Sequence, residues 1–221
     1  MTRPIRQGTV MVMDRAKRCP RCGTPVRRDE YGHWWCSADG MVAPIGAYEE
    51  PSVHVLLKHI TDAQMPTWLP WPMPANWSVS GVGRAGEAPE QATVLACSGP
   101  DPIAGDADLV MVCEEPGIGL GAFYAGAAGL DVGRQISGFP AATRIMVGQH
   151  AAPLWWVGER DDRDVLVGEA SGRWLWIIAW PATAGAMIRD GTTFVDLRTL
   201  LGQLDVIPLS GLSRRLTDSE A

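Results

Sequence analysis

The stretches Cys19-Pro20-Arg21-Cys22 and Cys36-Ser37-Ala38-Asp39 decide how the N-terminal part of this chain folds. Each stretch places two metal-binding side chains three positions apart, and residues 23–35 separate the two stretches. Two turns of this spacing can point four ligands at one ion, so the pattern predicts a zinc ribbon held by Cys19, Cys22, Cys36 and Asp39. Because four protein ligands close a tetrahedral site, the zinc is predicted to be structural.

The fourth ligand is the irregular position of this site. Zinc accepts a carboxylate oxygen, so Asp39 completes a sound Cys₃Asp set, although Cys or His is more usual there. His33 is the alternative, but it precedes Cys36 and therefore fits the second turn less well. Gly23 and Gly40 each follow the last ligand of a turn, where the backbone needs a residue that tolerates positive φ.

The ribbon is predicted to span residues 15–44, with short strands at 26–28 and 32–35. So small a module cannot bury both Trp34 and Trp35, so one of them is expected to pack on the rest of the chain. Residues 1–14 show no periodicity and are expected to be a disordered leader, with Met11 or Met13 as alternative starting points.

Composition indicates a soluble, cytoplasmic protein. The chain has 221 residues, of which 46% are hydrophobic and 20% charged, as in ordinary globular proteins. No apolar run has the length of a membrane span, and the first residues lack the apolar core of a signal peptide. Cys97 and Cys113 stand in apolar, strand-like runs and are expected to be buried free thiols, which suits a reducing compartment.

Charge is unevenly distributed along the chain. Residues 1–30 carry eight basic and three acidic side chains, whereas the rest carries eleven basic and twenty-two acidic ones. A basic ribbon on an acidic body could meet nucleic acid or an acidic protein surface. Because no aromatic-basic stripe or recognition helix accompanies the charge, nucleic-acid binding is the less favoured reading.

Residues 45–76 are predicted to form a helix and a strap rich in Pro and Trp. Ser52 is the expected N-cap of a helix over 53–61, whose buried stripe is Val53, Leu56, Leu57 and Ile60. His59 is placed on the solvated side. The four prolines of the strap exclude a helix or a central strand there. Its tryptophans, Trp68 and Trp71 among them, are expected to pack on the body, with a ligand-stacking wall as the alternative.

Residues 77–216 are predicted to form a mainly antiparallel β domain with a few short helices, so the fold class is α+β. Short apolar runs between Gly, Pro and Asp turns carry this prediction. The expected strands include 109–114, 122–124, 165–170, 174–180, 193–197 and 206–209, with a hairpin turn at Ser171-Gly172 and short helices at 182–189 and 198–204. Residues 217–221 are expected to fray.

The loop after the predicted strand 109–114 is the candidate site of the body. Glu114 precedes Gly117, Gly119 and Gly121, and glycines allow close approach to a backbone. The spacing is not that of a phosphate-binding G-x-G-x-x-G loop, and a Walker lysine is missing. Glu114 and Glu115 are adjacent, so on a strand they face opposite ways. Internal packing of the glycines is therefore the favoured interpretation, and a binding or catalytic loop is the alternative.

Several motifs together resemble an uncharacterised actinobacterial family in which a zinc ribbon precedes a Trp-rich domain of unknown function. They are the two metal-binding stretches, Trp68-Leu-Pro-Trp-Pro, Ala96-Cys-Ser-Gly-Pro, Glu114-Glu-Pro-Gly-Ile-Gly-Leu-Gly-Ala and Gly172-Arg-Trp-Leu-Trp. The resemblance covers most of the chain after the leader. It implies that His usually stands where this chain has Asp39, and it implies no activity.

Two functions from different classes follow. The first is a non-catalytic adaptor, in which a structural zinc ribbon is fused to a β-rich body whose Trp-bearing surface binds an as yet undefined protein partner or a small ligand. The second is an enzyme acting on an acyl or phosphorylated small molecule at the 117–121 loop, which requires a pocket where a glutamate and an arginine converge. The chain shows no nucleophile–base pair and no cofactor fingerprint, which favours the adaptor.

Overall fold

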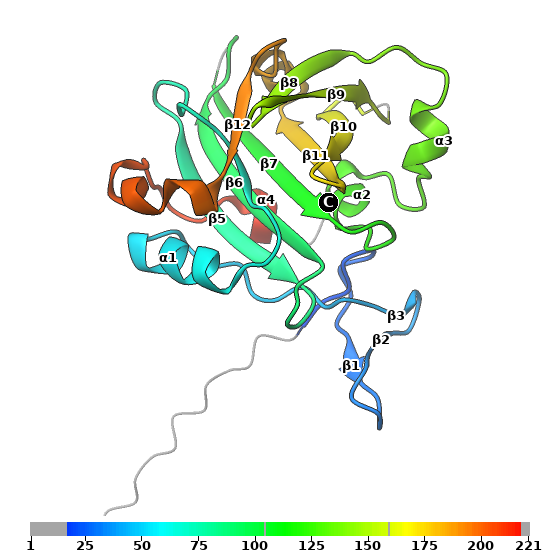
Figure 1. Ribbon diagram of the computed structural model, residues 1–221. Helices are drawn as coiled ribbons and strands as arrows, with labels where there is room; N and C mark the ends of the chain where they lie inside the picture. The colour runs from blue at the N-terminus through cyan, green and yellow to red at the C-terminus, as the bar shows by residue number, and fades with distance from the viewer. Residues whose placement is uncertain (1–16, 104, 159, 218–221) are drawn as a thin grey trace, which may run out of the picture.

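A small N-terminal sheet and a large curled sheet with short helices make up the protein (Figure 1). The structure, a computed structural model, describes residues 17–103, 105–158 and 160–217. The predicted α+β class, with a small module ahead of a mainly antiparallel domain, is confirmed. The predicted leader at 1–14 and residues 218–221 of the predicted frayed tail lie outside the described residues, whereas Thr217, the first tail residue, ends a short helix.

The elements of the N-terminal half are β1 (Arg27–Arg28), β2 (Trp34–Cys36), β3 (Gly40–Met41), α1 (Val53–Asp62), β4 (Trp68–Pro70), β5 (Ser78–Ala85), β6 (Ala92–Pro100) and β7 (Asp106–Glu114). Those of the C-terminal half are α2 (Leu120–Ala125), α3 (Val132–Ile136), β8 (Thr143–Val147), β9 (His150–Trp156), β10 (Asp164–Ala170), β11 (Arg173–Trp180), η1 (Ala182–Met187), β12 (Thr193–Asp196), η2 (Leu197–Val206) and α4 (Arg214–Thr217).

Nine strands form the main sheet in the order β4-β12-β8-β9-β10-β11-β7-β6-β5. All neighbours are antiparallel except β12 and β8. Short turns connect several of the pairs. Ser171 and Gly172 both have positive φ in the two-residue turn between β10 and β11, as this kind of hairpin requires, so the predicted turn is confirmed.

Side chains alternate between the two faces of the main sheet along each strand, and each face carries its own buried apolar layer. On β7, Leu109, Met111 and Cys113 belong to one apolar layer, which α1, η1 and η2 cover. Val110 and Val112 belong to the other layer, which α2, α3 and α4 cover. The short helices are therefore divided between the two faces, and β7 with β11 lies near the middle of the sheet.

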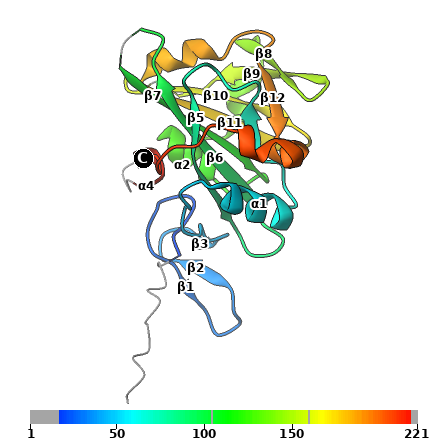
Figure 2. The ribbon, with the colours of Figure 1, turned by 90° about the vertical axis from the view of Figure 1, so that its left-hand side faces the viewer.

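The N-terminal module, here residues 17–44, lies below one end of the main sheet (Figure 2). The segment that follows it is hydrogen-bonded to the free edge of β5: Gly46 N donates to Arg84 O, Gly86 N to Pro44 O, and Glu49 N to Val82 O. This segment covers an edge that would otherwise expose unpaired backbone groups. The same hydrogen bonds fix the position of the N-terminal module relative to β5.

The helix after the module begins where the sequence predicted. Ser52 caps α1 by accepting a hydrogen bond from Val55 N at 3.1 Å. The predicted buried stripe is partly wrong, since Val53 and Leu57 are exposed while Leu56, His59 and Ile60 are buried. His59 was expected in solvent. It is tolerated inside because its Nε2 is hydrogen-bonded to Thr67 Oγ1 at 2.9 Å.

The strap docks on the main sheet as expected. Its prolines tolerate only an edge position, and β4 pairs with β12 alone at the end of the sheet. Trp68 and Trp77 are buried in the first apolar layer, and Trp71 is half-buried against it.

Three further predictions about the C-terminal half need correction. Residues 122–124 lie in helix α2 and not in a strand, because the Glu114 carboxylate at the end of β7 accepts the first backbone N–H groups of that helix. The segment 206–209 makes only a single bridge, between Leu209 and Val79. The helices predicted near 182–189 and 198–204 occur, but both are of the 3₁₀ type.

Candidate metal centre

Two turns position the four predicted metal ligands. In the first, Gly23 N donates to Cys19 O at 2.9 Å, and Gly23 adopts φ 69°. In the second, Cys36 ends β2 and pairs with Gly40, which begins β3 with φ 73°. Both glycines thus take the left-handed conformation that the sequence predicted, and Asp39 is held in the tight connection between the two strands.

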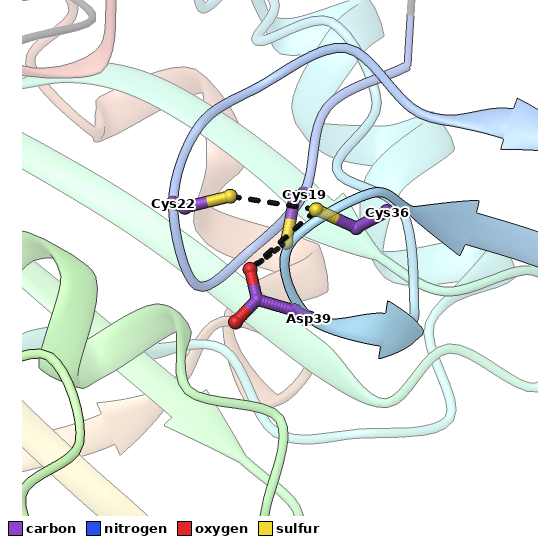
Figure 3. A group of neighbouring side chains, drawn as sticks. All are labelled: Cys19, Cys22, Cys36 and Asp39. Atoms are coloured by element: carbon purple, nitrogen blue, oxygen red, sulfur yellow. Dashed lines mark hydrogen bonds between the residues drawn. The ribbon is translucent and has the colours of Figure 1, made fainter.

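The four ligand atoms converge on one point (Figure 3). One atom from each of Cys19, Cys22, Cys36 and Asp39 lies within 4.8 Å of all the others. The Cys22 and Cys36 sulfurs are 3.5 Å apart, and Asp39 Oδ2 lies 3.2 Å from Cys19 Sγ and 3.5 Å from Cys36 Sγ. The edges of a tetrahedral zinc site are about 3.5–3.8 Å, so two of these separations have that size and the third is slightly shorter. The cluster could therefore hold a metal ion.

The surroundings raise the pKa of one candidate ligand, Cys19, and lower the pKa of two others, Cys36 and Asp39. Burial raises the pKa of the Cys19 thiol. At Cys36 burial acts in the same direction, but hydrogen bonds from Thr24 and from the backbone lower the pKa overall. A hydrogen bond from Cys22 is the largest of several effects that lower the pKa of Asp39. A cation in the cluster would be needed to hold Cys19 as a thiolate beside the Asp39 carboxylate.

His33, the alternative fourth ligand, does not join the cluster. Its side chain is exposed, and Nδ1 lies 3.4 Å from an Asp29 carboxylate oxygen on the outer side of the β1–β2 turn. Of the two module tryptophans, Trp34 faces Glu87 in the loop between β5 and β6, and its indole lowers the pKa of that carboxyl. Trp35 remains 52% exposed. Trp34 packs against the buried residues of the module itself, Cys19, Val26 and Cys36, so the packing of one tryptophan on the rest of the chain stays a prediction.

Arg21 connects the cluster of candidate metal ligands to the candidate loop of the main sheet. Its Nη2 donates to Gly117 O at 2.7 Å and its Nε to Ile118 O at 3.3 Å, while Nη1 donates to Asp39 O at 3.4 Å. One guanidinium therefore bridges both metal-binding turns and the loop. At Gly119 an added Cβ would lie 2.9 Å from Arg21 Cγ, so the absence of a side chain there makes room for this arginine.

The predicted ligand-binding residues separate into two groups. Glu114, Gly117 and Gly119 line a cavity of about 790 Å³, whose other walls include Arg21 and Asp39. Gly121 does not line it. A Cβ on Gly121 would lie 2.1 Å from the Trp176 ring, so this glycine lets α2 pack on β11.

Trp68 and Trp71 belong to the apolar layer on the other face of the sheet, away from this cavity. The structure therefore does not bring them together with the glycine loop.

Three lining residues of this cavity were missed from the sequence, namely Asp131, Trp174 and Trp176. Trp174 is the partner of Glu114 across the β7–β11 pair, and Trp176 stands two residues further along the same face. Only the strand pairing brings them to Glu114, and no local pattern encodes that pairing. The alternation of Trp174 and Trp176 within a predicted strand was the one available signal that they share a face.

One comparison with known proteins is informative. A family model described as a family of unknown function, DUF6758, matches residues 13–216. No curated protein and no solved structure matches the chain. Within the described residues, no helix is long and apolar enough to cross a membrane.

Proposed function

The chain belongs to the DUF6758 family, whose function is unknown, and on that premise we propose that it is a non-catalytic adaptor. In this proposal a structural zinc ion holds the N-terminal module as a zinc ribbon, and the module binds an acidic segment of a partner protein. The observation that carries the proposal is an exposed row of Arg27, Trp35 and Met41 across the three strands of the module.

The donor set supports zinc in a structural role. Three sulfurs and one carboxylate oxygen are ligands that zinc accepts, and one such atom from each residue lies within 4.8 Å of the others. Catalytic zinc keeps one coordination position for water or substrate, whereas four protein ligands fill the sphere. Three thiolates and one carboxylate exceed the charge of Zn²⁺ by two negative charges, and Arg21 beside Asp39 offsets part of that excess.

The exposed row has the composition of a binding surface. Trp35 is 52% exposed and pairs directly with Met41, which is 63% exposed, while Arg27 pairs with Trp35 on its other side. Trp, Met and Arg are enriched in protein interfaces, and Trp and Arg are the residues that most often dominate their energetics. Tyr31, in the β1–β2 turn of the same module, is a further exposed aromatic side chain, with 78% of its surface accessible.

Charge favours an acidic partner over nucleic acid. Arg27 forms no ion pair within the part of the chain that the structure describes, so its charge is available to a partner. By contrast, Arg28 is paired with Glu87 and lies over the Trp34 ring, and Arg21 is bound to carbonyl oxygens. A nucleic-acid surface would need several free cations in a row. One free arginine beside an exposed Trp suits a peptide or protein segment.

The enzyme alternative retains one supporting observation, which is the cavity lined by Glu114, Gly117 and Arg21. Other contacts weaken it. The Arg21 guanidinium is occupied by backbone carbonyls. Glu115, the second carboxylate of the motif, is 2.9 Å from Arg173 and does not line the cavity. The cavity therefore brings a glutamate and an arginine together, but the guanidinium already has backbone partners and the second glutamate lies outside.

Metal analysis and partner capture test the adaptor proposal. Protein purified without chelator should hold about one zinc per chain, and Cys22→Ser should lose it, because folding of so small a module is coupled to its metal. Asp39→Ala should weaken zinc binding less than Cys22→Ser, and His33→Ala should leave it unchanged. Absence of zinc from the purified protein would contradict the proposal.

Trp35→Ala should weaken capture of an acidic partner by about 1–3 kcal/mol while the zinc content and the melting temperature stay unchanged. Trp156→Ala is the matched control, since Trp156 is 49% exposed but stands on β9 of the main sheet. Partners from a lysate are quantified by mass spectrometry for both variants. Equal losses in the two variants, or a captured partner without an acidic segment, would count against the module as the binding surface.

A further inference from the structure

The cavity between the metal cluster and the main sheet has a defined floor and rim. Its floor is the ends of β7 and β11, which contribute Glu114 and Trp174. The α2–α3 connection, with Asp131, forms one wall. The metal-binding turns, with Arg21 and Asp39, form the other. The volume of about 790 Å³ is that of a site for a small molecule or for a few side chains of a partner.

Glu114 is a buried carboxylate without a counter-ion. Its side chain is 3% exposed, and Oε2 accepts hydrogen bonds from Leu120 N at 2.7 Å and Gly121 N at 3.3 Å. Within the described residues it forms no ion pair, because the neighbouring Arg173 is paired with Glu115. The Arg21 guanidinium is turned to the carbonyls of residues 117 and 118. A charge buried in this way is normally balanced by a partner or a ligand.

Aromatic rings stand beside this carboxylate. Trp174 is the cross-strand partner of Glu114, so the two side chains emerge next to each other on the same face of the sheet. Trp176 lies on the same face, two residues along β11. The face of an indole attracts cations more strongly than any other aromatic side chain does. A carboxylate and an indole side by side therefore favour a ligand that carries positive charge on an apolar stem.

We propose that this cavity binds an alkylammonium group, with the ammonium between the Glu114 carboxylate and the Trp174 ring and its alkyl stem along the cavity wall. Asp131 and Asp39 add negative potential at the rim. The group can come from a free amine or from a lysine side chain of another protein. This inference goes beyond the proposed function, which places the partner on the exposed row of the N-terminal module, and it does not depend on that row.

The same contacts argue against an acyl or phosphorylated ligand. The backbone N–H groups of Leu120 and Gly121, which could have bound an anion, are already taken by Glu114. The Arg21 guanidinium, the cation of this wall, already donates to the carbonyls of residues 117 and 118, so two of its N–H groups are not free to bind an anion. A second negative charge beside the buried Glu114 would be unfavourable in this environment.

Three probes of equal size test the proposal on the full chain with its metal. They are n-butylammonium, n-butanol and butyrate, titrated at constant ionic strength and followed by calorimetry and by tryptophan fluorescence. Butylammonium should bind saturably, with an affinity that falls as salt is added, and the neutral and anionic probes should bind at least about tenfold more weakly. Equal binding of butanol, or tighter binding of butyrate, would overturn the proposal.

Variants locate the binding group. Glu114→Gln keeps an oxygen for the N–H groups of α2 but removes the charge, so it should weaken butylammonium binding at least about tenfold. Glu50→Gln is the matched control and should leave binding unchanged, because Glu50 is exposed and lies outside the cavity. Trp174→Leu, at a half-buried position, should also weaken binding. If Glu114→Gln binds butylammonium as the natural chain does, at unchanged stability, the proposal fails.

A second comparison, between a lysine peptide and a capped single lysine, distinguishes the two possible sources of the ammonium group. A lysine peptide that binds more tightly than Nα-acetyl-lysine methylamide assigns the site to a protein partner, whereas similar affinities assign it to free amines. Zinc content and the effect of Trp35→Ala are measured on the same samples. Loss of butylammonium binding in Glu114→Gln with both of these unchanged separates the cavity from the proposed adaptor surface.

Discussion

Substituting the three glycines of the 117–121 loop one at a time by alanine should destabilise the protein in the order Gly121, Gly119, Gly117. The order follows from what each new methyl group would meet. Gly117 has φ 90° and open space around it, so only the left-handed backbone resists alanine, at about 1 kcal/mol. Gly119 has φ 89° and meets Arg21 Cγ at 2.9 Å, but that side chain can move, so about 1–2 kcal/mol is expected.

Gly121 differs because the obstacle is a ring that cannot move freely. Its new methyl would lie 2.1–2.3 Å from three atoms of Trp176, a side chain that is 1% exposed. Comfortable contact needs about 3.5–4.0 Å, so the indole or helix α2 must shift by more than about 1 Å. Overpacking of this size costs about 3 kcal/mol. A shift of α2 would also loosen the hydrogen bond from Gly121 N to Glu114.

Urea unfolding followed by tryptophan fluorescence measures the series, with zinc content determined for each variant. The free energies of unfolding are compared at a common slope, since a changed slope would indicate a changed unfolded or native state. The reasoning is refuted if Gly121→Ala unfolds at the same urea concentration as the natural chain, or if Gly117→Ala is the most destabilised. Either result would show that the loop glycines are not there for Arg21 and Trp176.

Two further predictions concern buried titratable groups. Burial lowers the pKa of His59 from 6.5 to about 4, so as pH falls the unfolded chain binds a proton at this histidine before the folded chain does. The free energy of unfolding should therefore drop by up to about 3 kcal/mol between about pH 6.5 and 4. If the stability of His59→Gln changes with pH as steeply as that of the natural chain, this prediction is wrong. Burial raises the pKa of Cys113 to about 12 and also raises the pKa of Cys97, so neither thiol should react with iodoacetamide at pH 8 until urea unfolds the chain. Peptide mass mapping measures the labelling. If either cysteine of the folded protein is labelled as fast as a free thiol, this prediction is wrong.

The sequence located what is encoded locally. The spacing of Cys19, Cys22, Cys36 and Asp39 predicts a pair of turns, and the small sheet β1-β2-β3 between and beside them brings the four side chains together. Ser52 marks the start of α1 because a cap acts within one turn of helix. Positive φ at Gly23, Gly40 and Gly172 likewise follows from the turns in which they stand.

What the sequence could not reveal depends on contacts between distant segments. Residues 120–125 form a helix because Glu114, six residues earlier, accepts its first N–H groups from the end of a strand. His59 is buried because Thr67 meets it from the strap. Trp174 lies beside Glu114 only because β11 pairs with β7. The cavity of the main sheet is assembled from such pairings, so its lining could not be read from any single motif.

Arg21 has a thermodynamic consequence that reaches beyond its hydrogen bonds. It stands between Cys19 and Cys22 and donates to the carbonyls of the loop that borders the cavity, so order in the candidate metal-binding turns and order in that loop are expected to be coupled. Linkage then requires reciprocity: whatever factor zinc contributes to the affinity of a ligand in the cavity, that ligand contributes to the affinity for zinc. If the coupling is positive, a cavity ligand would slow the loss of zinc to a chelator, and Arg21→Met would weaken that effect because it removes the guanidinium that touches both sites.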